Sequence, residues 1–248
     1  MLKELFTAAL GMQNQHTKLE VTANNLANAN TSGYKRSEAF ERNLIDARAN
    51  FYNTPGDLEQ NDPPIGSYVD YSAGSFNQTE NQLDVAIENK GFFALQDGEG
   101  KKFLTRAGRF KVTEDGTITA MDGKTLLGKE GPINVFQEFM EEGTANMDVR
   151  SLEIRINEKG QVYANAKEVG SIPVFKPQDE KTLQRISNSE FIATNWSEIE
   201  ELDESQITLR QGWLEGSYVN VVNEMIEMIE LQRMFEAGSK VIKTNDDT

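Results

Sequence analysis

The sequence contains no cysteine and only one histidine among its 248 residues. Without cysteine, the chain can form no disulfide, no thiolate metal site and no cysteine nucleophile. We expect His16 to be a polar residue tolerated on a helix face rather than a pH switch, because a lone histidine makes neither a zinc site nor a triad. Neither a Gly-x-Ser-x-Gly elbow nor a His-Glu-x-x-His motif occurs. The sequence therefore predicts no catalytic residues, no metal ligands and no cofactor.

Basic residues are outnumbered, since 25 Lys and Arg face 40 Asp and Glu and the net charge is −15. Proteins that bind nucleic acid present a basic surface to the phosphates, and no stretch of this chain supplies one. We therefore expect no nucleic-acid partner. The acids concentrate in Glu198–Glu204. This run is typical of a solvated edge, and an acidic docking surface for a basic partner is the alternative interpretation.

Long hydrophobic runs are also missing. A membrane helix needs about 20 consecutive apolar residues, and no segment approaches that length. The first residues do not read as a secretory signal, because Glu4 and the polar run Gln13–His16 interrupt any apolar core. We therefore expect neither insertion into a membrane nor a signal-peptide route out of the cytoplasm.

Both ends of the chain carry a helical repeat in which residues follow each other at alternating steps of three and four, the spacing of a heptad. At the N-terminus the repeat comprises Leu2, Leu5, Ala9, Met12, His16, Leu19, Ala23 and Leu26. Near the C-terminus it comprises Leu214, Tyr218, Val221, Met225, Met228, Gln232, Phe235, Ser239 and Ile242. Repeats at both ends of a chain, separated by a segment of a different kind, indicate helices that pack together and against neighbouring copies. This is the layout of an assembly subunit.

Local signals mark where these helices end. The first helix is predicted from Leu2 to Leu26, because Asn28–Gly33 favours turns and Gly33 can adopt the left-handed conformation that ends a helix. The last helix is predicted to begin near Ser217 or Asn220, either of which can act as its N-cap. Its acids come early and its bases come late, as the helix dipole favours.

The middle of the chain, from Tyr68 to about Gln211, shows the period of two that is typical of strands. Runs such as Leu83–Ile87 and Leu152–Ile156 alternate, and Asp-Gly or Lys-Gly steps recur between them. The Gly98–Lys102 segment has a faint likeness to a phosphate loop but lacks its first glycine and its Ser or Thr, so we predict a hairpin tip.

These signals predict an α+β fold, in which N- and C-terminal helices pair as a coiled-coil-like terminal domain beside a mostly antiparallel β middle domain. We expect a discontinuous helical assembly domain at 1–35 and 212–248, a connector at 36–67 and a β-rich domain at 68–211.

Part of the apolar surface exceeds what one partner helix would cover, because Val222, Ile226 and Ile229 form a second face beside the C-terminal repeat. One interpretation is a helical hairpin that buries its own repeat. The more specific interpretation is that this surface contacts neighbouring subunits.

The Asn run either ends the helix or lets Asn24 and Asn28 hydrogen-bond another helix, with Ala23 and Ala27 permitting close approach. On the first helix, the predicted assembly interface is Leu2, Leu5, Ala9, Met12, Leu19, Ala23, Asn24, Leu26, Ala27 and Asn28. On the last helix it is Val221, Val222, Met225, Ile226, Met228, Ile229, Phe235 and Ile242.

Several motifs, in order along the chain, resemble the bacterial flagellar rod and hook proteins. They are Ala23–Arg36, Leu83–Ile87 with Gly91–Phe93, Leu104–Phe110, Leu214–Ser217 with Val219–Val222 and Met228–Arg233, and Ser239–Ile242. Between about 132 and 208 the resemblance is loose. Within that family, the length of the chain and the short segment between Arg36 and Tyr68 are more similar to proximal than to distal rod subunits.

The resemblance implies an axial subunit that is exported by the flagellar type III apparatus without a cleaved signal. Such subunits polymerise into a helical tube, with paired terminal helices lining the channel and a β-rich domain outside. The implied partners are copies of itself, other flagellar rod and hook proteins, and the export apparatus. The implied location is the basal body outside the cytoplasm, in the periplasm where an outer membrane is present. A coiled-coil adaptor or surface-displayed binding module is the alternative function.

Overall fold

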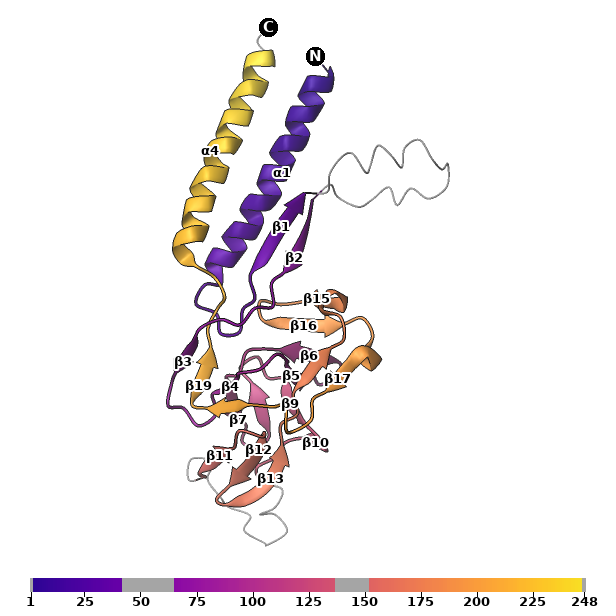
Figure 1. Cartoon of the computed structure of the whole chain (residues 1–248), viewed down its shortest axis with the longest axis vertical. Helices are drawn as coiled ribbons and strands as arrows, with labels where there is room; N and C mark the ends of the chain where they lie inside the picture. The colour runs from indigo at the N-terminus through magenta and orange to yellow at the C-terminus, as the bar shows by residue number, and fades with distance from the viewer. Residues whose placement is uncertain (1, 42–64, 137–151, 247–248) are drawn as a thin grey trace. The chain divides into compact units, whose positions relative to one another are not determined.

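The computed structural model describes residues 2–41, 65–136 and 152–246, which form two compact units (Figure 1). The first unit is built from Met1–Ala29, Lys35–Tyr71 and Val219–Thr248, and the second from Asn30–Tyr34 and Ser72–Tyr218. Each unit therefore combines segments that are far apart in the sequence.

The first unit contains the two long helices and a two-stranded ribbon. Helices α1 (Leu2–Ala27) and α4 (Val221–Asp246) each have 26 residues, and they lie side by side with opposite chain directions (Figure 1). Strands β1 (Ser37–Glu41) and β2 (Ile65–Val69) pair antiparallel and lie next to α1. The prediction of one helix near each end of the chain is confirmed.

The start of α4 is fixed by a side-chain cap. The Asn220 carbonyl oxygen Oδ1 accepts hydrogen bonds from the backbone N–H groups of Val222 and Asn223 at 3.1 and 3.2 Å. These N–H groups belong to the first turn and have no partner within the helix. Of the two predicted N-caps, Asn220 is the one that the structure uses.

The second unit consists of short strands joined by turns. Its strands are β3 (Phe76–Gln78), β4 (Val85–Ile87), β5 (Phe93–Gln96), β6 (Lys102–Thr105), β7 (Phe110–Val112), β8 (Ile118–Ala120), β9 (Thr125–Gly128), β10 (Gly131–Pro132), β11 (Ile154–Ile156), β12 (Gln161–Ala164), β13 (Lys167–Ser171), β14 (Phe175–Pro177), β15 (Leu183–Arg185), β16 (Glu190–Ala193), β17 (Ile199–Glu201), β18 (Leu209–Gln211) and β19 (Trp213–Glu215). The 3₁₀ turns η2 (Glu180–Thr182) and η3 (Trp196–Glu198) connect some of them.

The strand pairs of this unit are antiparallel. The largest sheet has the order β15-β16-β6-β5-β9-β8-β7, with β10 paired to β9, and a second sheet has the order β11-β12-β13. Three ladders of two strands, β14-β17, β18-β4 and β19-β3, complete the unit. The predicted α+β class with a mostly antiparallel β middle is therefore confirmed.

Many turns follow the glycines of the sequence, but between β12 and β13 the residues with positive φ are Asn165 and Ala166. In the β5–β6 hairpin, the Asp-Gly step Asp97–Gly98 predicts a positive φ at Gly98, but Gly100 adopts it, with φ +86°. The side chain of Asp97 explains the shift, because its Oδ1 accepts hydrogen bonds from the N–H groups of Glu99 and Lys101 at 3.0 and 2.9 Å. Such a side-chain bond organises a turn by itself. The segment is a hairpin tip, as predicted.

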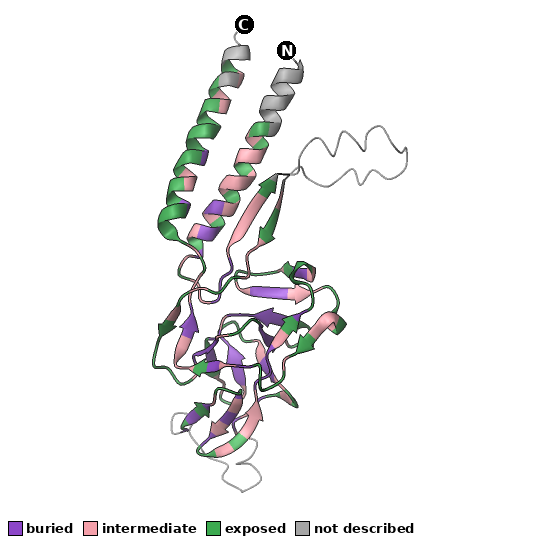
Figure 2. Cartoon of the chain, viewed as in Figure 1, coloured by how far each residue is buried: buried purple, intermediate pink, exposed green. Residues whose placement is uncertain are grey.

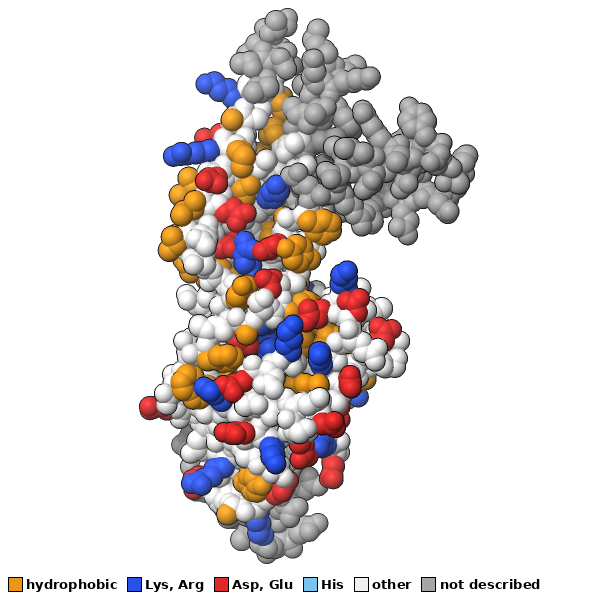
Figure 3. Space-filling view, in the orientation of Figure 1, with side chains coloured by type: hydrophobic (Ala, Val, Ile, Leu, Met, Phe, Trp, Pro, Cys, Tyr) orange, Lys and Arg blue, Asp and Glu red, His pale blue; other side chains and the backbone are white. Residues whose placement is uncertain are grey.

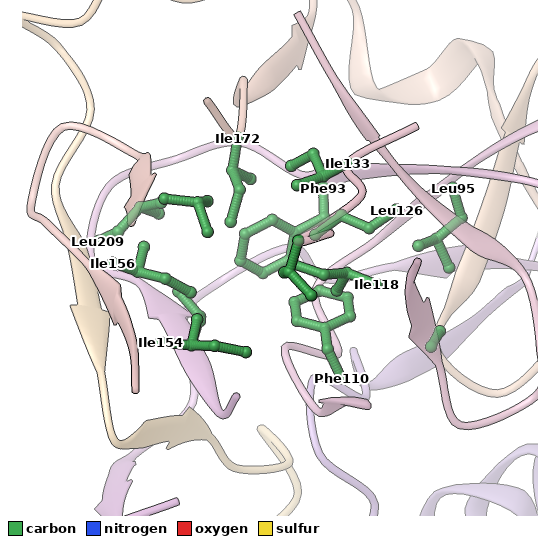
Figure 4. Packing of buried hydrophobic residues seen from close by; sticks show 14 of the residues in the cluster. Phe93, Leu95, Phe110, Ile118, Leu126, Ile133, Ile154, Ile156, Ile172 and Leu209 are labelled. Carbon is green, nitrogen blue, oxygen red and sulfur yellow. The ribbon is translucent and has the colours of Figure 1, made fainter. Parts of the chain in front are cut away.

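Among the described residues of the second unit, one apolar cluster joins side chains from the largest sheet and the β11-β12-β13 sheet (Figures 2 and 4). Phe93 of β5 and Phe110 of β7 meet edge to face, with ring centroids 5.3 Å apart. Ile154 and Ile156 of β11, together with Leu209 of β18, line the same cluster (Figure 4). Burial of these side chains supplies the main stabilisation of the unit.

The segment Asn30–Tyr34 folds with the second unit although it follows α1 directly. The N–H of Gly33 donates to the carbonyl oxygen of Glu215 at 2.8 Å, and the N–H of Tyr218 donates to that of Tyr34 at 3.2 Å. The Tyr34 ring is fully buried, with the Arg185 guanidinium 4.7 Å from its centroid. The turn after α1 is therefore an integral part of the β unit.

Gly33 is the residue that this turn requires. Its φ is +68°, and an added Cβ would lie 2.5 Å from the backbone of both Arg106 and Ala107. We predict that Gly33→Ala lowers the free energy of unfolding of the second unit by at least the cost of a left-handed alanine, about 1–2 kcal/mol. Urea unfolding followed by tryptophan fluorescence measures this, because both tryptophans, Trp196 and Trp213, belong to the second unit.

The matched control is Gly98→Ala, since nothing lies within 4 Å of a Cβ at Gly98 and its φ is not positive. This control should unfold at the wild-type urea concentration. Equal midpoints for the two variants would contradict the tight fit assigned to Gly33.

Candidate assembly interface

Helix α4 exposes a group of apolar side chains near its N-terminal end, which we call the α4 patch. Its members are Val221, Val222, Met225, Ile226 and Ile229, whose exposed fractions are 37, 64, 49, 52 and 51%. Figure 3 shows hydrophobic side chains at the surface of the helical unit. The one charged residue between Val219 and Ile226, Glu224, is 1% exposed. From Val221 to Ile226 the patch is thus an apolar surface without an exposed charge, and the acids Glu227 and Glu230 follow it along the helix.

The face of α4 that packs within the unit is a different one. Glu224 and Leu231 are buried there, at 1 and 3% exposure. Further along, a Cβ at Gly238 would lie 3.2 Å from the Cγ of Met12, so the helices approach closely at this end. Met228 and Ile242 are partly buried. The predicted interface residues on α4 therefore divide into a group near the helix–helix contact and the exposed α4 patch.

On α1, the predicted interface residues also divide. Met12, Leu19, Ala23 and Leu26 are partly buried, and Asn24 and Ala27 are exposed. Leu2, Leu5 and Ala9 lie on α1, but their side chains fall outside the described part of the chain. Asn28, one residue beyond α1, is buried and its Nδ2 donates to the backbone oxygen of Asn24 at 2.9 Å, a bond at the end of that helix.

Asn25, which the sequence pattern did not single out, joins three segments of the unit. Its Nδ2 donates to the carbonyl oxygen of Ser37 at 2.8 Å, and its Oδ1 accepts from the N–H of Ser37 at 2.9 Å. The same Nδ2 lies 3.3 Å from Oε2 of Glu224. Asn25 is 1% exposed, so these bonds form away from water, where leaving them unmade is costly. One side chain therefore ties α1 to both β1 and α4.

Arg36 completes the arrangement, which we call the Glu224 network. Its Nε donates to Oε1 of Glu224 at 2.5 Å, its Nη1 bonds Glu38, and its Nη2 lies 3.5 Å from Oε2 of Glu227. Tyr68 donates its hydroxyl hydrogen to Glu38, and this bond raises the pKa of Tyr68. Partial burial alone would lower the pKa of Arg36, but the hydrogen bond and charge of Glu224 outweigh it and raise that pKa.

Sequence reasoning missed these residues for identifiable reasons. Glu224 looked like an ordinary first-turn acid that favours the helix dipole, and Arg36 stood in the expected connector. The partners Asn25 and Glu224 are 199 positions apart. The one signal that could have found part of the network is the motif Ala23–Arg36, which resembles the flagellar proteins and contains both Asn25 and Arg36.

The chemistry available at these surfaces is association rather than catalysis. Among the described residues, no group of three or more His, Cys, Asp or Glu is placed to hold a metal ion. In the same part of the chain, no helix is both long enough and apolar enough to cross a membrane. The arrangement offers an internally paired charge network and an uncovered apolar patch, which are features of a surface that binds protein.

Three family models match successive parts of the chain. The model of the flagella basal body rod protein matches residues 5–35, and the flagellar hook protein FlgE/F/G D1 domain matches 86–164. The flagellar basal body rod FlgEFG protein C-terminal model matches 210–248. Together they define the class of protein, a rod or hook protein of the bacterial flagellum.

Curated relatives narrow the class. The flagellar basal-body rod protein FlgG of Borreliella burgdorferi is 32% identical and covers 100% of this chain and 96% of its own length. FlgG of Agrobacterium fabrum is 30% identical, and the match covers 99% of this chain and 96% of FlgG. The flagellar basal-body rod protein FlgF of Caulobacter vibrioides is 28% identical, and the match covers 94% of this chain and 90% of FlgF. The chain belongs to the family of flagellar basal-body rod proteins.

We predict that Glu224→Gln weakens the helical unit without affecting the β unit. The substitution keeps the shape but removes the charge that pairs with Arg36, and hydrogen bonds to charged groups contribute about 1.5–3 kcal/mol. Thermal unfolding followed by circular dichroism at 222 nm should show earlier loss of helix. Tryptophan fluorescence, which reports on the second unit, should melt as in the wild type.

The control is Glu230→Gln, which neutralises an exposed acid two turns further along the same helix. It should leave helix melting close to that of the wild type, because exposed charges contribute little. Identical helix melting in the two variants would show that the Glu224 network does not hold the unit together.

Proposed function

We propose that this chain is a structural subunit of the flagellar rod and polymerises through α1 and α4 into a helical tube that serves as drive shaft and export channel. Membership of the rod family makes it a structural component of the flagellar basal body rather than an enzyme. The observation that supports polymerisation through the helices is the α4 patch. Its apolar side chains are exposed in the described part of the chain, and burying them against another copy is favourable.

Charge supports the same choice of surface. Copies that each carry a net charge of −15 repel one another, and like charges placed face to face in an interface are costly. The α4 patch lessens this repulsion, because Glu224, the acid between Val221 and Ile226, is buried against Arg36 and Asn25. The Glu224 network therefore also removes an acid from the surface where copies are proposed to meet.

The helical assembly domain of the proposal is discontinuous, built from the N-terminal segment 1–35 and the C-terminal segment 212–248, with 68–211 as the β-rich domain and 36–67 as the connector. A coiled-coil-like pairing of α1 and α4 is supported by spacing on α4. Glu224, Met228, Leu231, Phe235, Gly238 and Ile242 follow each other at steps of four and three, and they range from buried to about one-third exposed. This is the spacing of a heptad face.

Partners follow from the family. The proposed partners are copies of this chain, other rod and hook proteins, and the flagellar type III export apparatus. The proposed location is outside the cytoplasm, and in the periplasm where an outer membrane is present. Placement among the proximal rod subunits stays a prediction, since the relatives include both FlgG and FlgF. Immunogold labelling of purified basal bodies would assign the position along the rod.

The alternative is a coiled-coil adaptor or surface binding module. An adaptor would bind one partner and stop at a defined complex, whereas a rod subunit forms tubes in a concentration-dependent way. Sedimentation and negative-stain microscopy of the purified chain separate the two functions.

We predict that Ile226→Asp abolishes rod assembly and leaves the folded monomer intact. Ile226 is 52% exposed in the monomer, so the aspartate is hydrated there. In the polymer the carboxylate would be buried without a partner, at a cost of several kcal/mol in each copy. Sedimentation of the purified protein, together with motility and basal-body formation in cells, measures the effect.

Asn223→Asp is the matched control, because it adds the same charge to an exposed neighbour on the same helix. It should assemble nearly as well as the wild type. Polymers of normal yield from Ile226→Asp would show that the α4 patch is not a contact between copies.

A deletion tests the division into domains. Removing residues 219–248 eliminates α4 but retains the segments that build the second unit. We predict that the truncated chain keeps its wild-type tryptophan fluorescence and near-UV circular dichroism, since the apolar cluster is untouched. It should fail to form polymers. Assembly of the truncated chain would show that α4 is dispensable for the rod.

A further inference from the structure

The α1–α4 pair has two sides, and the described residues of the chain cover one of them. On that side, Asn25 and Arg36 attach the β1–β2 ribbon to the helices. The remaining hollow, of about 410 Å³, is lined by charged groups including Lys18, Arg36 and Glu227. This side is thus occupied and polar.

A second hollow is formed by the two helices alone. It has a volume of about 380 Å³ and its lining is His16 and Leu19 of α1 with Gln232, Phe235 and Glu236 of α4. We call it the interhelix groove. Leu19 is partly buried and Phe235 is 36% exposed, so apolar side chains form part of its wall. Among the described residues, none from the ribbon contributes to this lining.

We propose that the interhelix groove of one copy receives the α4 patch of a second copy. This inference rests on the proposed function and names the two surfaces that meet in the rod. The groove presents Leu19 and Phe235, and the patch presents Ile226 and Ile229, so contact removes apolar area from water on both partners. Glu224 is buried, and the next two acids, Glu227 and Glu230, line the hollow on the ribbon side, so Val222 and Ile226 bring no acid of their own beside Glu236 at the edge of the groove.

Symmetry favours this pairing over contact between two patches. A patch that binds an identical patch forms an isologous interface, which closes at two copies. Docking of patch into groove uses two different surfaces, so each copy keeps one of them free for the next copy. Such a head-to-tail contact generates an open helical filament when its rotation does not close into a ring. A rod requires a contact of this second kind.

The absence of native cysteine allows a direct test by disulfide cross-linking. Two full-length variants, Ile226→Cys in the patch and Leu19→Cys in the groove, are prepared separately, one with a tag that changes its size. They are mixed in equal amounts at a concentration where the wild type sediments as polymer, and then oxidised. The proposal predicts that the mixed dimer is the dominant product on non-reducing gels.

Each variant alone should give little dimer. Glu230→Cys, at an exposed position of α4 that lines the ribbon side, should not cross-link to Leu19→Cys. Phe235→Cys provides a second groove position in case Leu19→Cys alters the helices, and it should also pair with Ile226→Cys. Circular dichroism at 222 nm verifies that each variant keeps its helices.

Two results would overturn the docking proposal while leaving the proposed function standing. One is a dominant dimer of Ile226→Cys with itself, which indicates an isologous contact between patches. The other is a sedimenting polymer of the mixed variants in which neither groove cysteine forms a mixed dimer. If the wild-type chain forms no polymer at any concentration, polymerisation through these helices itself fails, and sedimentation identifies that outcome separately.

Discussion

The ion pair between Glu224 and Arg36 is the interaction on which the helical unit depends. Glu224 lies in the first turn of α4 with 1% of its side chain exposed, and burial of an unpaired carboxylate would be prohibitive. Arg36 supplies the counter-charge from the segment before β1, and Asn25 supplies a hydrogen bond from α1. Three segments must therefore come together for any of them to be satisfied. This requirement fixes the register of α4 on α1.

The same pair determines what the surface of α4 offers. With Glu224 turned inward, the first turns of α4 present Val222, Met225 and Ile226 without an exposed charge between them. An acidic chain of this kind is protected from non-specific association by its net charge, and association is favoured where that charge is absent. The buried Glu224 network and the exposed α4 patch therefore arise from the same orientation of α4.

The β unit is constructed on a different principle. Its stability comes from one apolar cluster, with Phe93 and Phe110 at its centre, and from turns whose backbone conformation is set by glycine. Gly33 extends that principle to the segment that follows α1, because the backbone of Arg106 and Ala107 leaves no space for a side chain. The N-terminal motif is thus divided in its role. Asn25 and Arg36 serve the helical unit, and Gly33 and Tyr34 serve the β unit.

The sequence by itself determined the elements. Steps of three and four placed a helix near each end, and alternation with Asp-Gly turns placed antiparallel strands between them, because both patterns act over neighbouring residues. Only the tertiary structure decided which helix face is inward. The heptad repeat pointed to Val221 and Met225, but the buried positions are Glu224 and Leu231. A glutamate becomes an interior residue only when Arg36 and Asn25, which are distant in the sequence, pack against it. Local periodicity does not indicate such contacts.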